Sequence, residues 1–244
     1  MRGDHFVRAI LPIAGIPRHA TADIAPIGAD PDRCSSSNWT KPAAYCATAS
    51  RVKSRPMNAP VIYIHGFNSS PASFKAELIR RELIRRGRGV DFFAPTLPPS
   101  PADASRLLQD LVRNHPRAVL VGSSLGGYYA TWMVERFALR AVLLNPAVRP
   151  YDLLIGEVGR QKNFHTGEDY DFTIRHIEEM RALEVENLTP DRYLLLAAKG
   201  DEVLDYRHAV ERYRGAQQVL IESGDHGLSD FEQYLDQVFA FLGE

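Results

Sequence analysis

The sequence contains little cysteine. Its 244 residues include only two, Cys34 and Cys46, and both lie before residue 57. The rest of the chain therefore has no disulfide framework, and an apolar core must hold it together. Such low cysteine usage fits a reducing compartment, so we expect a cytoplasmic protein.

The sequence also lacks a strong net charge and a long apolar run. Its formal net charge of −1 gives no reason to expect nucleic acid or an acidic membrane surface as a partner. No apolar run approaches the roughly 18 residues of a membrane-spanning helix. With 45% hydrophobic and 24% charged residues, the composition is typical of one globular domain, alone or with a tail.

Two kinds of ligand-binding motif are missing as well. No group of His, Cys or Asp residues has the spacing of metal ligands, and no glycine-rich loop has the pattern of a phosphate site. We therefore expect neither a metal nor a cofactor.

Residues 1–56 differ in character from the rest of the chain. They contain six prolines, eight basic and four acidic residues, whereas acidic residues outnumber basic ones after residue 56. No helical or strand period persists there for more than a few residues. This pattern predicts a disordered or loosely attached extension, and it assigns the folded domain to residues 57–244.

Two interpretations of the extension stay open. The apolar run at residues 9–16, with small residues at 20–22, has features of a signal peptide, although Asp4 and Pro12 oppose that interpretation. We favour the alternative that Met57 is the true start of the protein. The intact mass of the native protein would test this, since a native chain with the upstream residues would exclude it.

Short apolar runs alternate with helical patterns from residue 61 onward. We predict strands at 61–64, 90–94, 118–121, 140–144, 193–198 and 218–222, and helices at 73–86, 102–114, 125–137, 206–213 and 231–242. Nearly continuous apolar strands joined by helices are typical of a parallel sheet covered on both faces. The sequence therefore predicts a three-layer αβα sandwich with about six strands, mostly or wholly parallel.

Residues 149–189 interrupt this alternation. A short helix is expected at 150–158 and a longer one at 173–183, separated by a polar stretch with aromatic residues. Long excursions in compact domains are commonly functional, so we predict a small lid over the site. A surface excursion without such a role is the alternative.

The pattern G-x-S-x-G occurs at residues 122–126, between a predicted strand and a predicted helix. This context is typical of a nucleophile elbow, a sharp turn that exposes the hydroxyl of the central Ser124. The backbone N–H of Leu125, at the start of the helix, can point at an oxyanion. An ordinary glycine-rich turn with a buried serine is the alternative.

A serine hydroxyl needs a base to become a nucleophile, and the base needs a group that orients it. Asp201 and His226 follow the last two predicted strands, and parallel strands bring their carboxyl ends to one edge of the sheet. The chain order Ser124, Asp201, His226 is that of one known triad arrangement. Asp205 stays open as an alternative acid, although it is also placed to cap a helix.

Several motifs together resemble the α/β-hydrolases, and more narrowly the small bacterial esterases of the YqiA/YcfP type. The resemblance covers residues 57–244 and none of the extension, and two initial strands of the larger hydrolases are missing. The motifs are Ile64-His65-Gly66-Phe67-Asn68-Ser69-Ser70-Pro71, Gly122-Ser123-Ser124-Leu125-Gly126-Gly127-Tyr128, Asn145-Pro146-Ala147-Val148-Arg149-Pro150, Gly200-Asp201-Glu202-Val203-Leu204-Asp205-Tyr206 and Gly224-Asp225-His226-Gly227.

The resemblance implies a role for each matching residue. Ser124 resembles the nucleophile, His226 the general base and then acid, and Asp201 the orienting carboxylate. Phe67 and Leu125 resemble the two backbone donors of the oxyanion hole. The implied function is hydrolysis of a small acyl ester or thioester through an acyl-enzyme. A serine peptidase or acyltransferase, or a hydrolase-fold binding protein, is the alternative, and the oligomeric state is left open.

Other polar residues have simpler interpretations. His65 is expected to support the oxyanion loop, and Asp225 to stabilise a turn beside His226. The remaining histidines have no motif around them, so surface or packing roles are expected for His115, His165, His176 and His208. For His165 a place in the pocket wall is the alternative, because it lies in the predicted lid.

Overall fold

The computed structural model describes residues 59–164 and 166–243. The predicted extension at 1–56, both cysteines and His165 lie outside these described residues. Within the described part of the chain, none of the helices is both long enough and apolar enough to cross a membrane.

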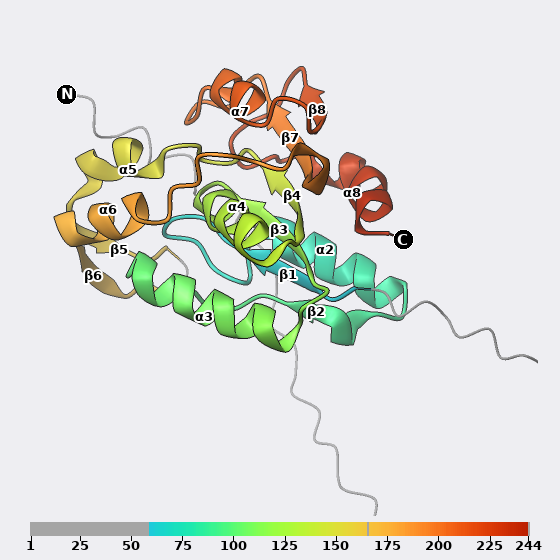
Figure 1. Ribbon diagram of the computed structural model, residues 1–244, viewed down its shortest axis with the longest axis horizontal. Coiled ribbons are helices and arrows are strands. Elements are labelled where there is room, and N and C mark those ends of the chain that lie inside the picture. Colours follow the sequence, from blue (N-terminus) through green and yellow to red (C-terminus); the bar gives the residue numbers. More distant parts are fainter. Residues whose placement is uncertain (1–58, 165, 244) are drawn as a thin grey trace, which may run out of the picture. The chain divides into compact units, whose positions relative to one another are not determined.

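Six parallel strands form the central sheet (Figure 1). Their order is β2-β1-β3-β4-β7-β8, and every neighbouring pair is parallel. The strands are β1 (Val61–Ile64), β2 (Phe92–Phe93), β3 (Val119–Ser123), β4 (Arg140–Leu144), β7 (Tyr193–Ala198) and β8 (Gln217–Ile221). The predicted parallel sheet of about six strands is confirmed.

Helices cover both faces of this sheet. Side chains of α2 (Phe74–Arg85) and α8 (Leu235–Leu242) pack on one face, while α3 (Pro101–Asn114), α4 (Leu125–Phe137) and α7 (Tyr206–Arg212) pack on the other. Successive strand residues alternate between the two cores, as the pleat requires: Ile62 lies with α4, and Tyr63 with α2. The predicted three-layer αβα sandwich is therefore confirmed.

The predicted strand at residues 90–94 is shorter than expected. Residues Gly89–Asp91 form a 3-10 turn where the strand was expected to begin, and only Phe92–Phe93 pair with β1. Val90 is 88% exposed, so its apolar side chain does not lie in the core. The prediction was wrong here because an exposed valine on a turn resembles a strand residue when only the local pattern is seen.

Residues 149–189, predicted as a lid-like excursion, contain several short elements. They include α5 (Pro150–Leu153), a 3-10 turn (Leu154–Glu157), an antiparallel hairpin of β5 (Gly159–Lys162) and β6 (Asp169–Phe172), and α6 (Ile174–Arg181). The hairpin was not predicted. Most of its side chains are exposed, so it has no alternating apolar pattern from which a strand is predicted.

Candidate active site

Ser124 occupies a strained turn between β3 and α4. Its backbone has φ 53° and ψ −120°, a conformation that L-residues rarely adopt. Two glycines make the turn possible, because a Cβ at Gly122 or Gly126 would overlap the neighbouring backbone, at Gly126 the carbonyl oxygen of Ile64. The predicted strand-turn-helix around the serine is thus present, and the strain is of the kind found at functional sites.

Ser124, His226 and Asp201 form one hydrogen-bonded row. The Nε2 of His226 lies 3.1 Å from Ser124 Oγ, and its Nδ1 lies 2.9 Å from Asp201 Oδ2. The carboxylate accepts a hydrogen bond from Nδ1–H, and in that tautomer Nε2 is the acceptor for the serine hydroxyl. The side chains of His226 and Asp201 are 8% and 2% exposed, so little water competes for these bonds.

The two candidate acids lie in different environments. Asp201 Oδ1 accepts hydrogen bonds from the backbone N–H groups of Val203 and Leu204, which fixes the carboxylate beside His226. Asp205 instead caps α7 by accepting from the backbone N–H of Arg207, and it forms an ion pair with that arginine at 2.6 Å. This arrangement lowers the pKa of Asp205 to about 2. Asp201, and not Asp205, contacts the histidine.

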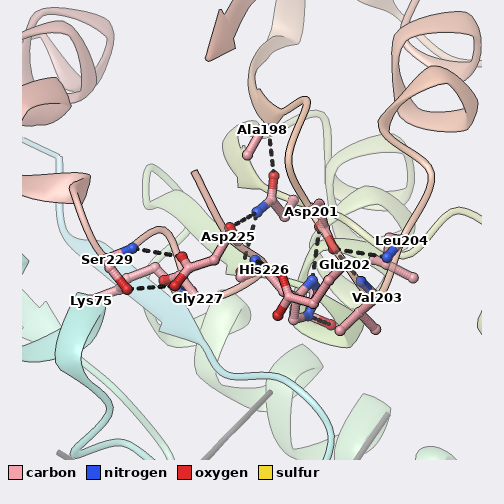
Figure 2. A network of polar contacts seen from close by, with 12 residues as sticks. Lys75, Ala198, Asp201, Glu202, Val203, Leu204, Asp225, His226, Gly227 and Ser229 are labelled. Atoms are coloured by element: carbon pink, nitrogen blue, oxygen red, sulfur yellow. Dashed lines mark hydrogen bonds and ion pairs between the residues drawn. The ribbon is translucent and has the colours of Figure 1, made fainter. Parts of the chain in front are cut away.

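Side chains from two other strand ends hold the loop that carries His226 (Figure 2). Asn145 follows β4, and its Nδ2 donates to the carbonyl oxygens of Asp225 and His226 at 3.0 and 3.1 Å, while its Oδ1 accepts from Ala198 N at 2.8 Å. Glu202 Oε2 accepts from the backbone N–H of His226 at 3.0 Å. The ring is therefore positioned through its backbone as well as through its nitrogens.

A buried lysine holds the same loop from the opposite side. Lys75 of α2 is 8% exposed, and its Nζ donates to the carbonyl oxygen of Gly227 at 2.7 Å (Figure 2). Asn145 and Lys75 were not predicted to act at the site. The position of Asn145 directly after a strand at the same sheet edge was a signal, but nothing in the local pattern marked a buried lysine on α2.

Burial lowers the pKa of Lys75 to about 8, against the opposing effect of the Asp225 and Asp201 carboxylates. Between about pH 8 and 10.5 the unfolded chain then holds a proton that the native chain lacks, so this group's contribution to the free energy of unfolding rises with pH. We expect the wild type to gain stability relative to Lys75→Met across this window, by at most about 1.4 kcal/mol per pH unit. Urea unfolding of both proteins at several pH values would check this, and a constant difference would contradict it.

The loop after β1 lies against the serine. A Cβ at Gly66 would be 3.7 Å from Ser124 Oγ, so the peptide between Gly66 and Phe67 is close to the hydroxyl. His65 supports this loop, because its Nε2 accepts from the backbone N–H of Leu97 at 3.2 Å. Leu125 begins α4 directly after the serine. The two residues assigned to an oxyanion hole therefore flank Ser124.

The β5–β6 hairpin packs on this loop. Asn68, with φ 52°, donates from Nδ2 to Gln161 Oε1 at 3.1 Å, and its Oδ1 accepts from Tyr170 OH at 2.6 Å. The rings of Phe67 and Phe172 meet edge to face at 5.2 Å between centroids. The hairpin therefore braces the loop on which one assigned oxyanion donor lies.

The hydrogen-bonded row of Ser124, His226 and Asp201 does not include the residues for which the sequence predicts turn, surface or packing roles. Asp225 accepts from the backbone N–H and the hydroxyl of Ser229, which stabilises a turn. His115 stacks near Phe93, with 4.1 Å between ring centroids. His176 accepts from the backbone N–H of Thr173 at the start of α6, and the exposed His208 lies on α7. None of these four side chains contacts Ser124, His226 or Asp201 in the interactions described.

A parallel six-stranded sheet, a strained serine between strand and helix, and the chain order Ser, Asp, His define an α/β-hydrolase fold. The family model of UPF0227, described as an uncharacterised protein family, matches residues 60–243. The chain belongs to this family. A UPF0227 protein of Citrobacter koseri is 24% identical over 187 residues, which cover 74% of this chain and 97% of that relative.

Solved structures share the fold at low sequence identity. Alpha/beta hydrolase domain-containing protein 10 from mouse has a TM-score of 0.58 and 15% identity, over 75% of this chain and 90% of its own. A structure of the metagenome-derived lipolytic enzymes LipS and LipT has a TM-score of 0.56 and 17% identity, over 76% of this chain and 94% of its own. These likenesses, with the family match, confirm the resemblance predicted from the motifs.

Proposed function

We propose that this protein is a serine hydrolase that cleaves carboxylic esters or acyl thioesters through an acyl-enzyme. The observation that carries the proposal is the buried, hydrogen-bonded row of Ser124, His226 and Asp201. Three residues with these distances and this chain order supply the nucleophile, the base and the orienting group that acyl transfer requires. The lipolytic activity of the fold relatives LipS and LipT is compatible with this chemistry.

In the first step, His226 Nε2 takes the proton of the Ser124 hydroxyl as Oγ attacks the ester carbonyl carbon. The negative charge that develops on the carbonyl oxygen is stabilised by the backbone N–H groups of Phe67 and Leu125, each contributing roughly 3 kcal/mol. Asp201 stabilises the imidazolium. The C–O or C–S bond then breaks, and the leaving alcohol or thiol takes the proton from His226.

In the second step, water replaces the alcohol. His226 takes a proton from the water as its oxygen attacks the acyl carbon, and the same backbone donors stabilise the second oxyanion. The ester bond to Ser124 breaks, and His226 returns the proton to Oγ. The acid leaves, and the enzyme is restored without any other reactant.

A fluorophosphonate probe and a set of p-nitrophenyl esters test this proposal together. We expect covalent labelling of Ser124, located by peptide mass mapping, and release of p-nitrophenol from at least the acetate ester. Activated esters are suitable substrates because they depend little on protonation of the leaving group.

The outcomes separate the remaining functions. The absence of both labelling and turnover would contradict the proposal. It would favour a binding protein that has kept the hydrolase fold. Labelling with transfer of the acyl group to an added amine or alcohol, faster than to water, would favour an acyltransferase. Cleavage of peptide substrates in preference to esters would favour a peptidase.

A further inference from the structure

A groove of about 570 Å³ lies against the loops that follow β4 and β7. Its walls come from the loop after β4, from α5, from the loop after β7, and from α7. The apolar part of its lining comprises Pro146, Val148, Leu153, Val203 and Leu204. A volume of this size is within the range of small-molecule sites in proteins, which are mostly apolar.

Two walls of the groove are joined directly to the hydrogen-bonded row. Ala147, between two lining residues, donates from its backbone N–H to the carbonyl oxygen of Ser124 at 3.1 Å. On the facing wall, the backbone N–H groups of Val203 and Leu204 donate to Asp201 at 2.9 and 2.8 Å. A ligand in the groove would therefore lie alongside the elbow and the acid loop.

The polar rim of the groove favours an uncharged ligand. Its charged side chains are engaged with neighbours: Arg149 pairs with Asp152 at 2.5 Å, and Asp205 pairs with Arg207. Glu211 pairs with Arg214, and the guanidinium of Arg212 donates to the carbonyl oxygens of Val185 and Glu186. A charged ligand would have to compete with these pairs, whereas an apolar chain would only displace water from the apolar lining.

The position of the His226 loop indicates which part of an ester would occupy the groove. Gly227 is bonded to Lys75 of α2, and Leu228 packs into the core under α2 and α8. The leaving group takes its proton from His226 and so must lie on that side. The groove, by contrast, is bordered by α5 and α7, and α7 covers the face of the sheet opposite to α2 and α8.

We propose that the groove binds the acyl chain of the substrate, an uncharged apolar chain longer than acetyl. This inference rests on the proposed function, and it adds a substrate class: esters or thioesters of medium-chain fatty acids. Each methylene buried in the groove should raise kcat/KM, up to roughly fourfold at full burial.

Two series of esters and a pair of matched variants test this inference. In the acyl series, p-nitrophenyl acetate is compared with p-nitrophenyl octanoate; in the alcohol series, ethyl acetate is compared with octyl acetate. Leu153 lines the groove and is 43% exposed, so Leu153→Trp fills the groove without disturbing the core. Ile155, 49% exposed and absent from the lining, provides the control Ile155→Trp.

We expect Leu153→Trp to lower the octanoate-to-acetate ratio of kcat/KM by about tenfold or more, since several methylenes lose their contacts. Leu153→Asp should lower the same ratio by placing a charge against the chain. Ile155→Trp should leave it unchanged, and the alcohol series should not respond to any variant. Circular dichroism and the melting temperature verify that each variant is folded.

Three results would overturn the inference, and they differ from one another. A response confined to the alcohol series would assign the groove to the leaving group. No response in either series, with acetate still hydrolysed, would leave the proposed function intact and remove the groove from it. Absence of acetate hydrolysis in the wild type would overturn the proposed function itself, and the acyl assignment with it.

Discussion

Ser124→Ala is expected to lower kcat/KM for a p-nitrophenyl ester by about 10⁴-fold or more, to the level that binding and oxyanion stabilisation alone support. The reason is that the variant keeps the turn, the backbone donors and the groove but has no atom that can form the acyl-enzyme. Initial rates at saturating and subsaturating ester would measure the loss. Fluorophosphonate labelling should disappear with it.

The matched control lies one residue upstream. Ser123 is also a buried serine, at the end of β3, but the hydroxyl within hydrogen-bond distance of His226 Nε2 is that of Ser124. Ser123→Ala should therefore retain labelling and most activity. Equal losses in Ser123→Ala and Ser124→Ala would show that the effect is a disturbed turn and not a lost nucleophile.

The combination of variants provides a further check. In the proposed mechanism Ser124 and His226 act in one proton transfer, so the double variant Ser124→Ala/His226→Ala should be little worse than either single variant. Additive losses would mean that the two residues act independently. Such a result would contradict the proposed mechanism, whatever the size of the single effects.

Most of the central fold could be predicted from the sequence, because buried parallel strands have a strong local signal. The strands at 61–64, 140–144 and 193–198 and the helix at 125–137 have their predicted bounds. The three strands are nearly continuous apolar runs followed within two residues by glycine or proline, and the helix begins at the G-x-S-x-G turn, so neighbouring residues alone define them. The exposed β5–β6 hairpin has no such signal, and it was missed.

The candidate site likewise contains some residues that local motifs predict and others that no local pattern predicts. Ser124 and His226 stand in motifs, so their residue types and chain order were sufficient to place them at one sheet edge. The choice between Asp201 and Asp205 depends on how a single loop turns, since both residues follow the same strand. The contact of Lys75 with Gly227 joins residues 152 positions apart, and no local pattern contains it.

Asp201→Asn is expected to lower kcat by about 10³- to 10⁴-fold while KM changes little. An asparagine amide can donate to His226 Nδ1 and so favours the tautomer that carries its proton on Nε2, where it cannot accept the proton of Ser124. The backbone bonds from Val203 and Leu204 to Oδ1 can be kept by the amide oxygen. The loss should therefore be kinetic, with little change in melting temperature.

Asp205→Asn is the matched control, four residues further along the same loop. Asparagine is also a good helix N-cap, so the start of α7 should persist although the ion pair with Arg207 is lost. That pair is exposed, so we expect only a small change in stability and a nearly unchanged kcat for p-nitrophenyl acetate, whose acyl group is too short to occupy the groove that Asp205 borders. Because Asp205 accepts from Arg207 N and not from His226, a collapse of kcat in Asp205→Asn, with activity retained in Asp201→Asn, would reverse the assignment of the acid.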